Sequence, residues 1–336
     1  MAITVLLNKN NFPFIANKWE EFQKTHPEIT LIEDTSANFQ EFESKIANNT
    51  DDITSVSLIA GVKNDYNLDA KIFDALPNLK AVCFCSAGYN QIDFAEATKR
   101  KIQVARVYDL DTSTADTNLF LLLGAMRFYQ ESIKDLYIHH KFQNPSKVGI
   151  APNGLTLGVV GLGAIGQAVV RRCLPLGFEK IIYYNRRQVA PELEKELGVT
   201  YVSSIDELVS QSDVVDLNCA LTPETYHLIN EERILKMKDE VIIVNTARGD
   251  VIDETALIKY LKNGKILSAG LDVFHNEPNI NYELVELDNV IALPHVGSFS
   301  KATRINAQLT VLKNVENYLS TGKLISFIGE QRGLFD

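Results

Sequence analysis

Short apolar runs alternate along most of the chain with stretches in which apolar residues recur at helical spacing. In the first third, the apolar runs predict strands and the intervening amphipathic stretches predict helices. The expected strands lie at residues 3–7, 55–59, 80–84 and 103–106, and the expected helices include 17–25, 70–75 and 93–101. Strands that alternate with helices in this way favour parallel sheets of the α/β class.

The same alternation resumes after one long helical pattern at about 114–137. Strands are expected at residues 157–160, 180–184, 214–218, 241–245, 266–271 and 290–292, and a last helix at about 301–320. We therefore predict two doubly wound parallel-sheet α/β domains. The nucleotide-binding domain is expected to be Rossmann-like and to span 113–301. It is expected to be inserted into a flavodoxin-like substrate domain made of 1–112 and 302–336.

The composition is that of an ordinary globular protein long enough for two domains. The chain has 336 residues, of which 46% are hydrophobic and 23% charged. Its net charge of −10 disfavours nucleic acid and anionic membranes as partners, because both would repel it. No apolar stretch approaches the roughly 20 residues that span a bilayer, and no signal peptide is recognisable, so a cytoplasmic location is expected. The four cysteines lie in apolar segments without zinc-binding spacing, which predicts buried thiols and no metal site.

A glycine-rich turn lies between an apolar run and a helical pattern in the middle of the chain. Its sequence, Gly161-Leu162-Gly163-Ala164-Ile165-Gly166, fits the G-x-G-x-x-G dinucleotide fingerprint. In that fingerprint Gly161 permits a tight turn, Gly163 lets the backbone approach a pyrophosphate, and Gly166 lets the helix pack closely on the sheet. Glycine-rich turns are also common as structural turns, but the strand and helix on either side favour a dinucleotide site.

The end of the next expected strand bears on which dinucleotide is bound. An acidic residue at that position would accept a hydrogen bond from the ribose 2′-hydroxyl of NAD. Here the strand ends in Asn185-Arg186-Arg187, without a carboxylate. Guanidinium groups match phosphate oxygens, so this sequence predicts a preference for NADP(H) over NAD(H). The alternative is a solvated basic turn.

Three later strand ends carry an arginine, a glutamate and a histidine, which together could reduce a 2-oxo acid. Arg248 could hold the carboxylate and polarise the carbonyl, and His295 could protonate the developing alkoxide. Glu277 could hold the imidazole in the required tautomer and favour its charged form. Each residue also has a simpler interpretation: a salt bridge for Arg248, a turn for Glu277 and a packed loop histidine for His295. His275 is the competing acid, because it lies two residues from Glu277.

These and other segments resemble the D-isomer-specific 2-hydroxyacid dehydrogenase family over nearly the whole chain. The matching segments are 86–93 (Ser-Ala-Gly-Tyr-Asn-Gln-Ile-Asp), 161–166, 221–225, 245–249, 270–274, 277–278 and 294–298. The resemblance implies that Arg248, Glu277 and His295 are the catalytic residues. It also implies that His295, rather than His275, is the acid and base.

The resemblance further implies which residues contact the substrate and the cofactor. Backbone amides near Ala87 and Gly88 would bind the substrate carboxylate, with Arg248 and His295 as further substrate contacts. Asp272 would bind the nicotinamide carboxamide. The remaining expected cofactor contacts are Gly161, Leu162, Gly163, Ala164, Ile165, Gly166, Asn185, Arg186, Arg187, Cys219, Ala220, Leu221, Thr225, Thr246, Ala247, Arg248, His295 and Gly297.

The expected activity is NADPH-dependent reduction of small 2-oxo acids to D-2-hydroxy acids. Glyoxylate and hydroxypyruvate are the first expected substrates, and bulkier 2-oxo acids are the alternative. A different class stays open, since some proteins of this fold resemble transcriptional co-repressors that sense dinucleotides and bind partners. The helical segment 119–123 is apolar on every side, which predicts a partner surface and, as is usual in the family, a homodimer.

Overall fold

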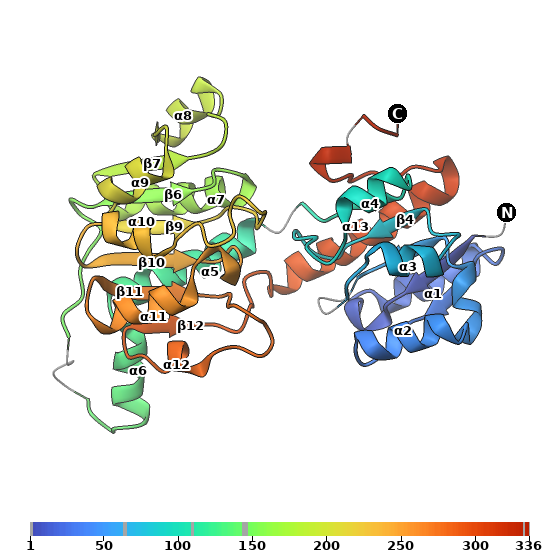
Figure 1. The fold of residues 1–336 in the computed structure, drawn as a ribbon, viewed down its shortest axis with the longest axis horizontal. Coiled ribbons are helices and arrows are strands. Elements are labelled where there is room, and N and C mark those ends of the chain that lie inside the picture. The colour runs from blue at the N-terminus through green and yellow to red at the C-terminus, as the bar shows by residue number, and fades with distance from the viewer. Residues whose placement is uncertain (1–2, 63–65, 109–110, 143–146, 332, 336) are drawn as a thin grey trace. The chain divides into compact units, whose positions relative to one another are not determined.

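The structure is a computed structural model that describes residues 3–62, 66–108, 111–142, 147–331 and 333–335. The chain divides into two compact units, which are described separately (Figure 1). Unit 1 comprises Met1–Leu110 and Ser300–Asp336, and unit 2 comprises Asp111–Phe299. The sequence placed this division at 112/113 and 301/302, and its assignment of substrate binding to unit 1 stays a prediction.

Unit 1 is built on a five-stranded parallel sheet with the order β2-β1-β3-β4-β5, which is the flavodoxin-like order. Its strands are β1 (Thr4–Leu7), β2 (Thr30–Glu33), β3 (Leu58–Ala60), β4 (Ala81–Cys83) and β5 (Gln103–Ala105). Its helices are α1 (Ala16–Thr25), α2 (Phe39–Ala47), α3 (Ala70–Ala75), α4 (Phe94–Lys99) and α13 (Lys301–Thr321). Short 3-10 helices lie at η1 (Lys9–Asn11), η2 (Thr50–Ser55) and η5 (Gly329–Gln331).

Strands β1, β3, β4 and β5 of this sheet are buried on both faces, because helices cover each side, whereas the edge strand β2 is largely accessible to solvent. On β1, Leu6 packs in the core that contains Phe42 of α2, whereas Val5 packs in the opposite core. That opposite core also contains Ala307 and Val311 of α13, which lie four positions apart and so share one face of the helix. Helix α13 is thus part of the core of unit 1.

Unit 2 contains a seven-stranded parallel sheet with the order β12-β11-β10-β9-β6-β7-β8. Its strands are β6 (Thr156–Val160), β7 (Lys180–Tyr184), β8 (Thr200–Tyr201), β9 (Val214–Leu217), β10 (Val241–Asn245), β11 (Ile266–Leu271) and β12 (Val290–Ala292). Its helices are α5 (Asp111–Met126), α6 (Tyr129–Tyr137), α7 (Ala164–Cys173), α8 (Pro191–Leu197), α9 (Ile205–Gln211), α10 (Glu231–Lys236), α11 (Glu254–Lys262) and α12 (Tyr282–Val285), with 3-10 helices η3 (Leu174–Leu176) and η4 (Gly249–Val251).

The chain order reverses at β6, since β7 pairs with one of its edges and β9 with the other. Such a switch point is where doubly wound sheets bind ligands, and here it lies directly before the glycine-rich turn. The strand order is that of a Rossmann sheet extended by one strand. The predicted fold class, with one Rossmann-like and one flavodoxin-like parallel sheet, is confirmed.

The single long helix predicted at about 114–137 is wrong. The structure has two helices, α5 and α6, separated at Arg127 and Phe128. Phe128 adopts a left-handed conformation with φ 51°. The carbonyl of Met126 accepts a hydrogen bond of 2.9 Å from the N–H of Ile150, a bond that an unbroken helix would form within itself. A contact made by a distant segment therefore ends α5.

The apolar segment 119–123 is buried largely within its own unit. Leu121 and Leu122 are fully buried, and Phe120 is 46% exposed. The helix packs on α7, β10 and β11, so unit 2 itself supplies most of the partner surface that the pattern predicts. None of the helices given above combines the length and the apolar character that a membrane-spanning helix needs.

Candidate active site

The glycine-rich turn joins β6 to α7 in a conformation that requires glycine. Gly161 has φ 97°, and a Cβ at this position would lie 2.7 Å from the carbonyl oxygen of Asn218. A Cβ at Gly166 would lie 2.1 Å from the carbonyl oxygen of Gly161. The turn therefore packs against the end of β9, and the first turn of α7 packs against the turn itself.

The outer side of this turn is open to a ligand. A Cβ at Gly163 would meet no described atom within 4 Å, and no described side chain caps the N-terminus of α7. Helix N-termini bind phosphate groups through their free N–H groups. The turn from Gly161 to Gly166, including Leu162, Ala164 and Ile165, therefore fits a dinucleotide pyrophosphate.

The three residues after β7 differ in how they are engaged. Asn185 accepts a hydrogen bond of 2.7 Å from the N–H of Leu162 through its side-chain oxygen, so it braces the glycine-rich turn. Arg186 and Arg187 are exposed. Within the described part of the chain, neither forms a salt bridge, which leaves both guanidinium groups available for an anion.

A buried polar network lies behind the turn, and the sequence analysis did not identify it. Asn118 of α5 donates hydrogen bonds to Asp216 of β9 (2.8 Å) and to the hydroxyl of Thr246 (3.0 Å). Asn218 also donates to Asp216, at 2.9 Å. Burial raises the pKa of Asp216 to about 7, although these two hydrogen bonds lower it. The signal that could have revealed it is an acidic residue within the apolar strand β9.

Glu277 and His295 form the central pair of the site. Nδ1 of His295 donates to Oε2 of Glu277 at 2.6 Å, and the N–H of Phe274 donates to Oε1 at 2.8 Å. The His295 side chain is 41% exposed, and no hydrogen bond within the described residues occupies its Nε2. Nε2 is therefore free to exchange a proton with a ligand.

Arg248 lies close enough to Glu277 for their charges to interact. It follows β10, where its carbonyl accepts from Nδ2 of Asn245 at 2.9 Å and its Nη1 donates to the carbonyl of Ala247 at 2.6 Å. Burial lowers the pKa of the half-buried Arg248, and the charge of Glu277 opposes this effect. Because an arginine titrates far above neutral pH, it remains a cation.

The turn that carries Arg248 packs tightly on the loop that carries Glu277. A Cβ at Gly249 would lie only 1.9 Å from the carbonyl carbon of Phe274 and 2.4 Å from the nitrogen of His275. Only glycine permits this approach of two backbones. This backbone contact keeps Arg248 and Glu277 close to each other.

His275 pairs with a different carboxylate. Its Nδ1 lies 2.5 Å from Oδ1 of Asp250, and its backbone N–H donates to Glu254 at 3.2 Å. The hydrogen bond to Asp250 raises the pKa of His275, against a smaller opposing effect of burial. The sequence did not decide which histidine pairs with Glu277. In the structure Glu277 is hydrogen-bonded to His295 and not to His275.

Asp272 fixes the turn that carries His295. Its two carboxylate oxygens accept from the N–H groups of Val296 (2.8 Å) and Gly297 (2.7 Å). Burial raises the pKa of Asp272, although both backbone hydrogen bonds lower it. This role in holding the turn was not foreseen from the sequence.

The other expected contacts are divided between the two units. Thr225 donates to the carbonyl of Ala220 at 2.7 Å, in the loop that also carries Cys219 and Leu221. Burial raises the pKa of the Cys219 thiol to about 11. Ala87 and Gly88 belong to unit 1, where their carbonyls accept from Arg106 (2.9 Å) and Ser86 (2.7 Å). Within the described residues, no group of three or more His, Cys, Asp or Glu side chains is arranged to hold a metal ion.

Glu277 should make a pH-dependent contribution to stability. Burial raises its pKa, but the hydrogen bond and charge of His295, the N–H of Phe274 and the charge of Arg248 together hold it below the ordinary value. A carboxylate of this kind stabilises the fold fully above its unfolded pKa of about 4.3 and loses that contribution as pH falls further. The difference in thermal unfolding midpoint between the native protein and Glu277→Gln should therefore be full at pH 5 and shrink toward pH 3.5.

Glu254→Gln is the matched control, because burial raises the pKa of Glu254. Folding disfavours the ionised form of Glu254. The difference in thermal unfolding midpoint between the native protein and Glu254→Gln should therefore change in the opposite direction as the pH falls. A difference for Glu277→Gln that grows as the pH falls would contradict this account.

The chain is similar to known enzymes over almost its whole length. Residues 119–297 match the family described as "D-isomer specific 2-hydroxyacid dehydrogenase, NAD binding domain". Glyoxylate reductase 1 of Saccharomyces cerevisiae is 40% identical, over 97% of this chain and 95% of that protein. The crystal structure of a glyoxylate reductase from Paecilomyes thermophila superposes with a TM-score of 0.89 at 36% identity, covering 98% of this chain and 99% of that one.

An NADPH-dependent glyoxylate/hydroxypyruvate reductase from Sinorhizobium meliloti, solved in complex with NADP and malonate, has a TM-score of 0.83 at 29% identity, covering 98% of each chain. With its Rossmann sheet and fingerprint, the chain belongs to the D-isomer specific 2-hydroxyacid dehydrogenases, oxidoreductases with a nicotinamide-nucleotide-binding domain.

Proposed function

We propose that this protein reduces small 2-oxo acids, glyoxylate and hydroxypyruvate first among them, to D-2-hydroxy acids with NADPH. The observation that carries the proposal is the Glu277–His295 pair, with its free Nε2 and the nearby charge of Arg248. The relatives named glyoxylate reductase support the substrate class. The relative solved with NADP supports the choice of cofactor.

Each residue of the pair has a defined task in this reaction. A bound nicotinamide nucleotide supplies the hydride that reduces the carbonyl carbon. Nε2 of His295 donates a proton to the carbonyl oxygen, while Glu277 holds Nδ1 and stabilises the imidazolium before transfer. The lowered pKa of Glu277 keeps this carboxylate ionised near neutral pH, as the task requires.

Charged and backbone groups hold the substrate and the cofactor in the proposal. The guanidinium of Arg248 binds the substrate carboxylate, together with backbone amides near Ala87 and Gly88. Asp272 binds the nicotinamide carboxamide through lone pairs left after its two backbone hydrogen bonds. The remaining cofactor contacts are those expected from the sequence, from the glycine-rich turn to Gly297. A cytoplasmic location stays a prediction.

His295→Ala should lower kcat by roughly 10²–10⁴-fold, because the reaction loses its proton donor. The matched control is His275→Ala, which removes an imidazole that pairs with Asp250 and should have a far smaller effect. Steady-state NADPH oxidation with glyoxylate and hydroxypyruvate measures both. If His275→Ala is the more damaging change, the assignment of His295 as the acid is wrong. If the native protein reduces no 2-oxo acid in a broad panel, the proposed reaction is wrong.

The residues after β7 support NADP(H) rather than NAD(H). Asn185 places no negative charge near a 2′-phosphate, and its side chain is already engaged by Leu162. Arg186 contributes to lowering the pKa of Glu224, after the hydrogen bonds from Thr222 and from the backbone of Glu224. Arg186 thus lies within electrostatic reach of the 220–225 loop, on the side where the cofactor contacts are proposed.

One well-placed arginine should favour NADPH over NADH by roughly 10- to 150-fold in kcat/KM, since charge-assisted hydrogen bonds contribute about 1.5–3 kcal/mol. The double variant Asn185→Asp/Arg186→Ala should shift preference toward NADH, and the aspartate can still accept from the N–H of Leu162. Arg187→Ala is the matched control that separates the two arginines. Comparable kcat/KM for the two cofactors in the native protein would refute the preference.

A homodimer is the proposed assembly, and α6 is the surface that supports it. Large apolar side chains are exposed on and just after this helix, among them Ile133, Leu136, Tyr137 and Ile138. Contiguous exposed apolar surface marks an interaction site more often than scattered single residues do.

Leu136→Glu combined with Ile133→Glu should convert the dimer to a monomer of 37.6 kDa in light scattering. The charges would have to be buried at the interface, which is costly. Leu235→Glu, at a residue of α10 that is 59% exposed against 44% for Ile133 and 47% for Leu136, is the control and should leave the dimer intact. A native protein that is already monomeric at working concentration would contradict the proposed homodimer.

A further inference from the structure

Arg106, which directly follows β5 in unit 1, is anchored at both its backbone and its charged end. Its backbone N–H donates to the carbonyl of Ser326 at 3.1 Å, and its carbonyl accepts from the Ser326 hydroxyl at 2.8 Å. The guanidinium carbon lies 4.5 Å from the ring centroid of Tyr108 and 5.6 Å from that of Tyr89, within the range of cation–π contacts. The position of this guanidinium is therefore well defined.

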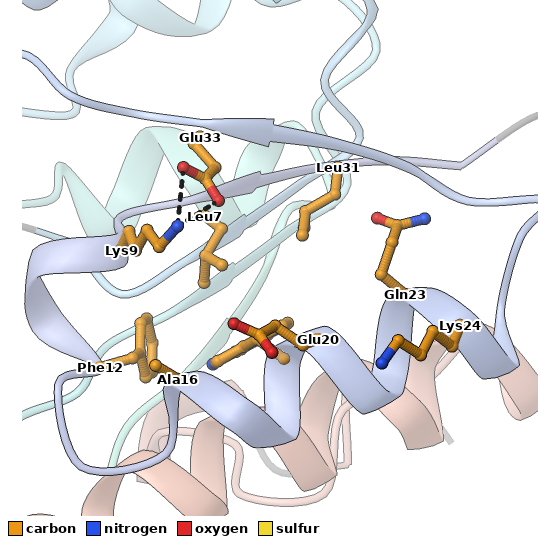
Figure 2. A pocket seen from close by; sticks show the side chains of 10 residues that line it. Leu7, Lys9, Phe12, Ala16, Glu20, Gln23, Lys24, Leu31 and Glu33 are labelled. Carbon is orange, nitrogen blue, oxygen red and sulfur yellow. Dashed lines mark hydrogen bonds and ion pairs between the residues drawn. The ribbon is translucent and has the colours of Figure 1, made fainter.

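The charge of Arg106 has no carboxylate partner among the described residues, although the side chain is half-buried. Other cations of unit 1 are paired. Lys9, which lines a cavity between α1 and strands β1 and β2, lies 2.9 Å from Glu33, as the dashed lines in Figure 2 show. Arg100 lies 2.8 Å from Glu96. Arg106 thus brings an uncompensated positive charge to its surroundings, which favours an anion nearby.

The guanidinium of Arg106 bonds to the loop at residues 86–89. Its Nη1 donates to the carbonyl of Ala87 at 2.9 Å. This carbonyl and the N–H of Gly88 belong to one planar trans peptide group, in which they point in opposite directions. Within the described residues, neither the N–H of Ala87 nor that of Gly88 donates a hydrogen bond. Arg106 therefore fixes this peptide from its carbonyl side and leaves the N–H of Gly88 directed away from itself, available to an acceptor.

The same bond makes the N–H of Gly88 a stronger donor. A charged donor on the carbonyl polarises the peptide group, and linked hydrogen bonds strengthen one another by about 10–30%. The Ser86 hydroxyl donates to the carbonyl of Gly88 at 2.7 Å, so the next peptide of the loop is held as well. The loop thus presents a fixed and polarised N–H with a cation behind it, an arrangement that suits a carboxylate.

We propose that Arg106 is a positioning residue for the carboxylate of the 2-oxo acid. It orients and polarises the peptide between Ala87 and Gly88, and the N–H of Gly88 binds the carboxylate. This inference rests on the proposed reduction of 2-oxo acids and adds to it a residue that acts through the loop rather than by touching the substrate.

Arg106→Met removes the charge and the donor but keeps an unbranched stem that can pack on the tyrosine rings. It should raise KM for glyoxylate or hydroxypyruvate about three- to ten-fold, as the loss of one net hydrogen bond predicts. A contact to the carboxylate is equally strong before and during hydride transfer, so kcat should change little, and so should KM for NADPH. Arg106→Lys keeps the charge and should recover part of the affinity for the 2-oxo acid.

Arg100→Met is the matched control, because Arg100 also lies over an aromatic ring, that of Phe73, but bonds to Glu96 instead of the loop. It should leave both KM values as they are in the native protein. Thermal unfolding of each variant checks that it is folded at the assay temperature. Should Arg106→Met not fold, Arg106→Gln takes its place, since it also lacks the charge and should show a higher KM for the 2-oxo acid than Arg106→Lys.

Three results would overturn the inference while leaving the proposed function intact. They are an unchanged KM for the 2-oxo acid in Arg106→Met, an equal rise in KM for NADPH, and an Arg106→Lys variant that is no better than Arg106→Met. If the native protein reduces no 2-oxo acid, the proposed function itself is wrong, and the role of Arg106 is wrong with it.

Discussion

Backbone contact between loops at one edge of the unit 2 sheet is the constraint on which the candidate site depends. Parallel strands end at the same edge, so the loops that follow β6, β9, β10 and β11 must share a small space. At Gly249 the room is so small that a Cβ would lie 1.9 Å from the carbonyl carbon of Phe274. A side chain there would push the loop with Arg248 away from the loop with Glu277, and the charge interaction between them would weaken with distance.

The carboxylates at this edge differ because their partners differ. Asp272 accepts two backbone N–H groups, yet burial still raises its pKa. Glu277 is also partly buried, but a histidine and an arginine add positive charge, and its pKa is lowered instead. The charge of His295 acts on both carboxylates, but only Glu277 also accepts a hydrogen bond from that imidazole and interacts with the charge of Arg248. The negative charge is thereby most favourable on the one carboxylate that faces the exposed imidazole.

Most of the fold could be predicted from the sequence, because periodicity and fingerprint spacing are local properties of the chain. The predictions failed where distant contacts decide. Nothing near Phe128 shows that Ile150 will bond to Met126 and end α5. The edge strand β2 gave no clear signal, since within it only Ile32 is buried.

In the candidate site, too, local features could be predicted from the sequence and features that depend on distant contacts could not. The motif positions of Arg248, Glu277 and His295 could be read directly, since each follows an apolar strand. Which histidine pairs with which carboxylate could not be read from the sequence, because Asp250, the partner of His275, lies 25 residues away in the chain. Asp272 could be recognised as a site residue, but its bonds to the turn of His295 depend on how two strand ends meet.

Asn118, which directly precedes the apolar segment 119–123 of α5, has a physical explanation in the buried network. Asn118 ties the helix to Asp216 of β9 and to Thr246 after β10, so it fixes the helix against two strand ends at once. The side-chain oxygens of Asn118 and Asn218 are buried acceptors without a partner among the described residues. Oδ2 of Asp216 is a third buried oxygen without a partner among these residues. Burial in this network raises the pKa of Asp216, and its bond to Asn218 holds the strand end against which the turn at Gly161 packs.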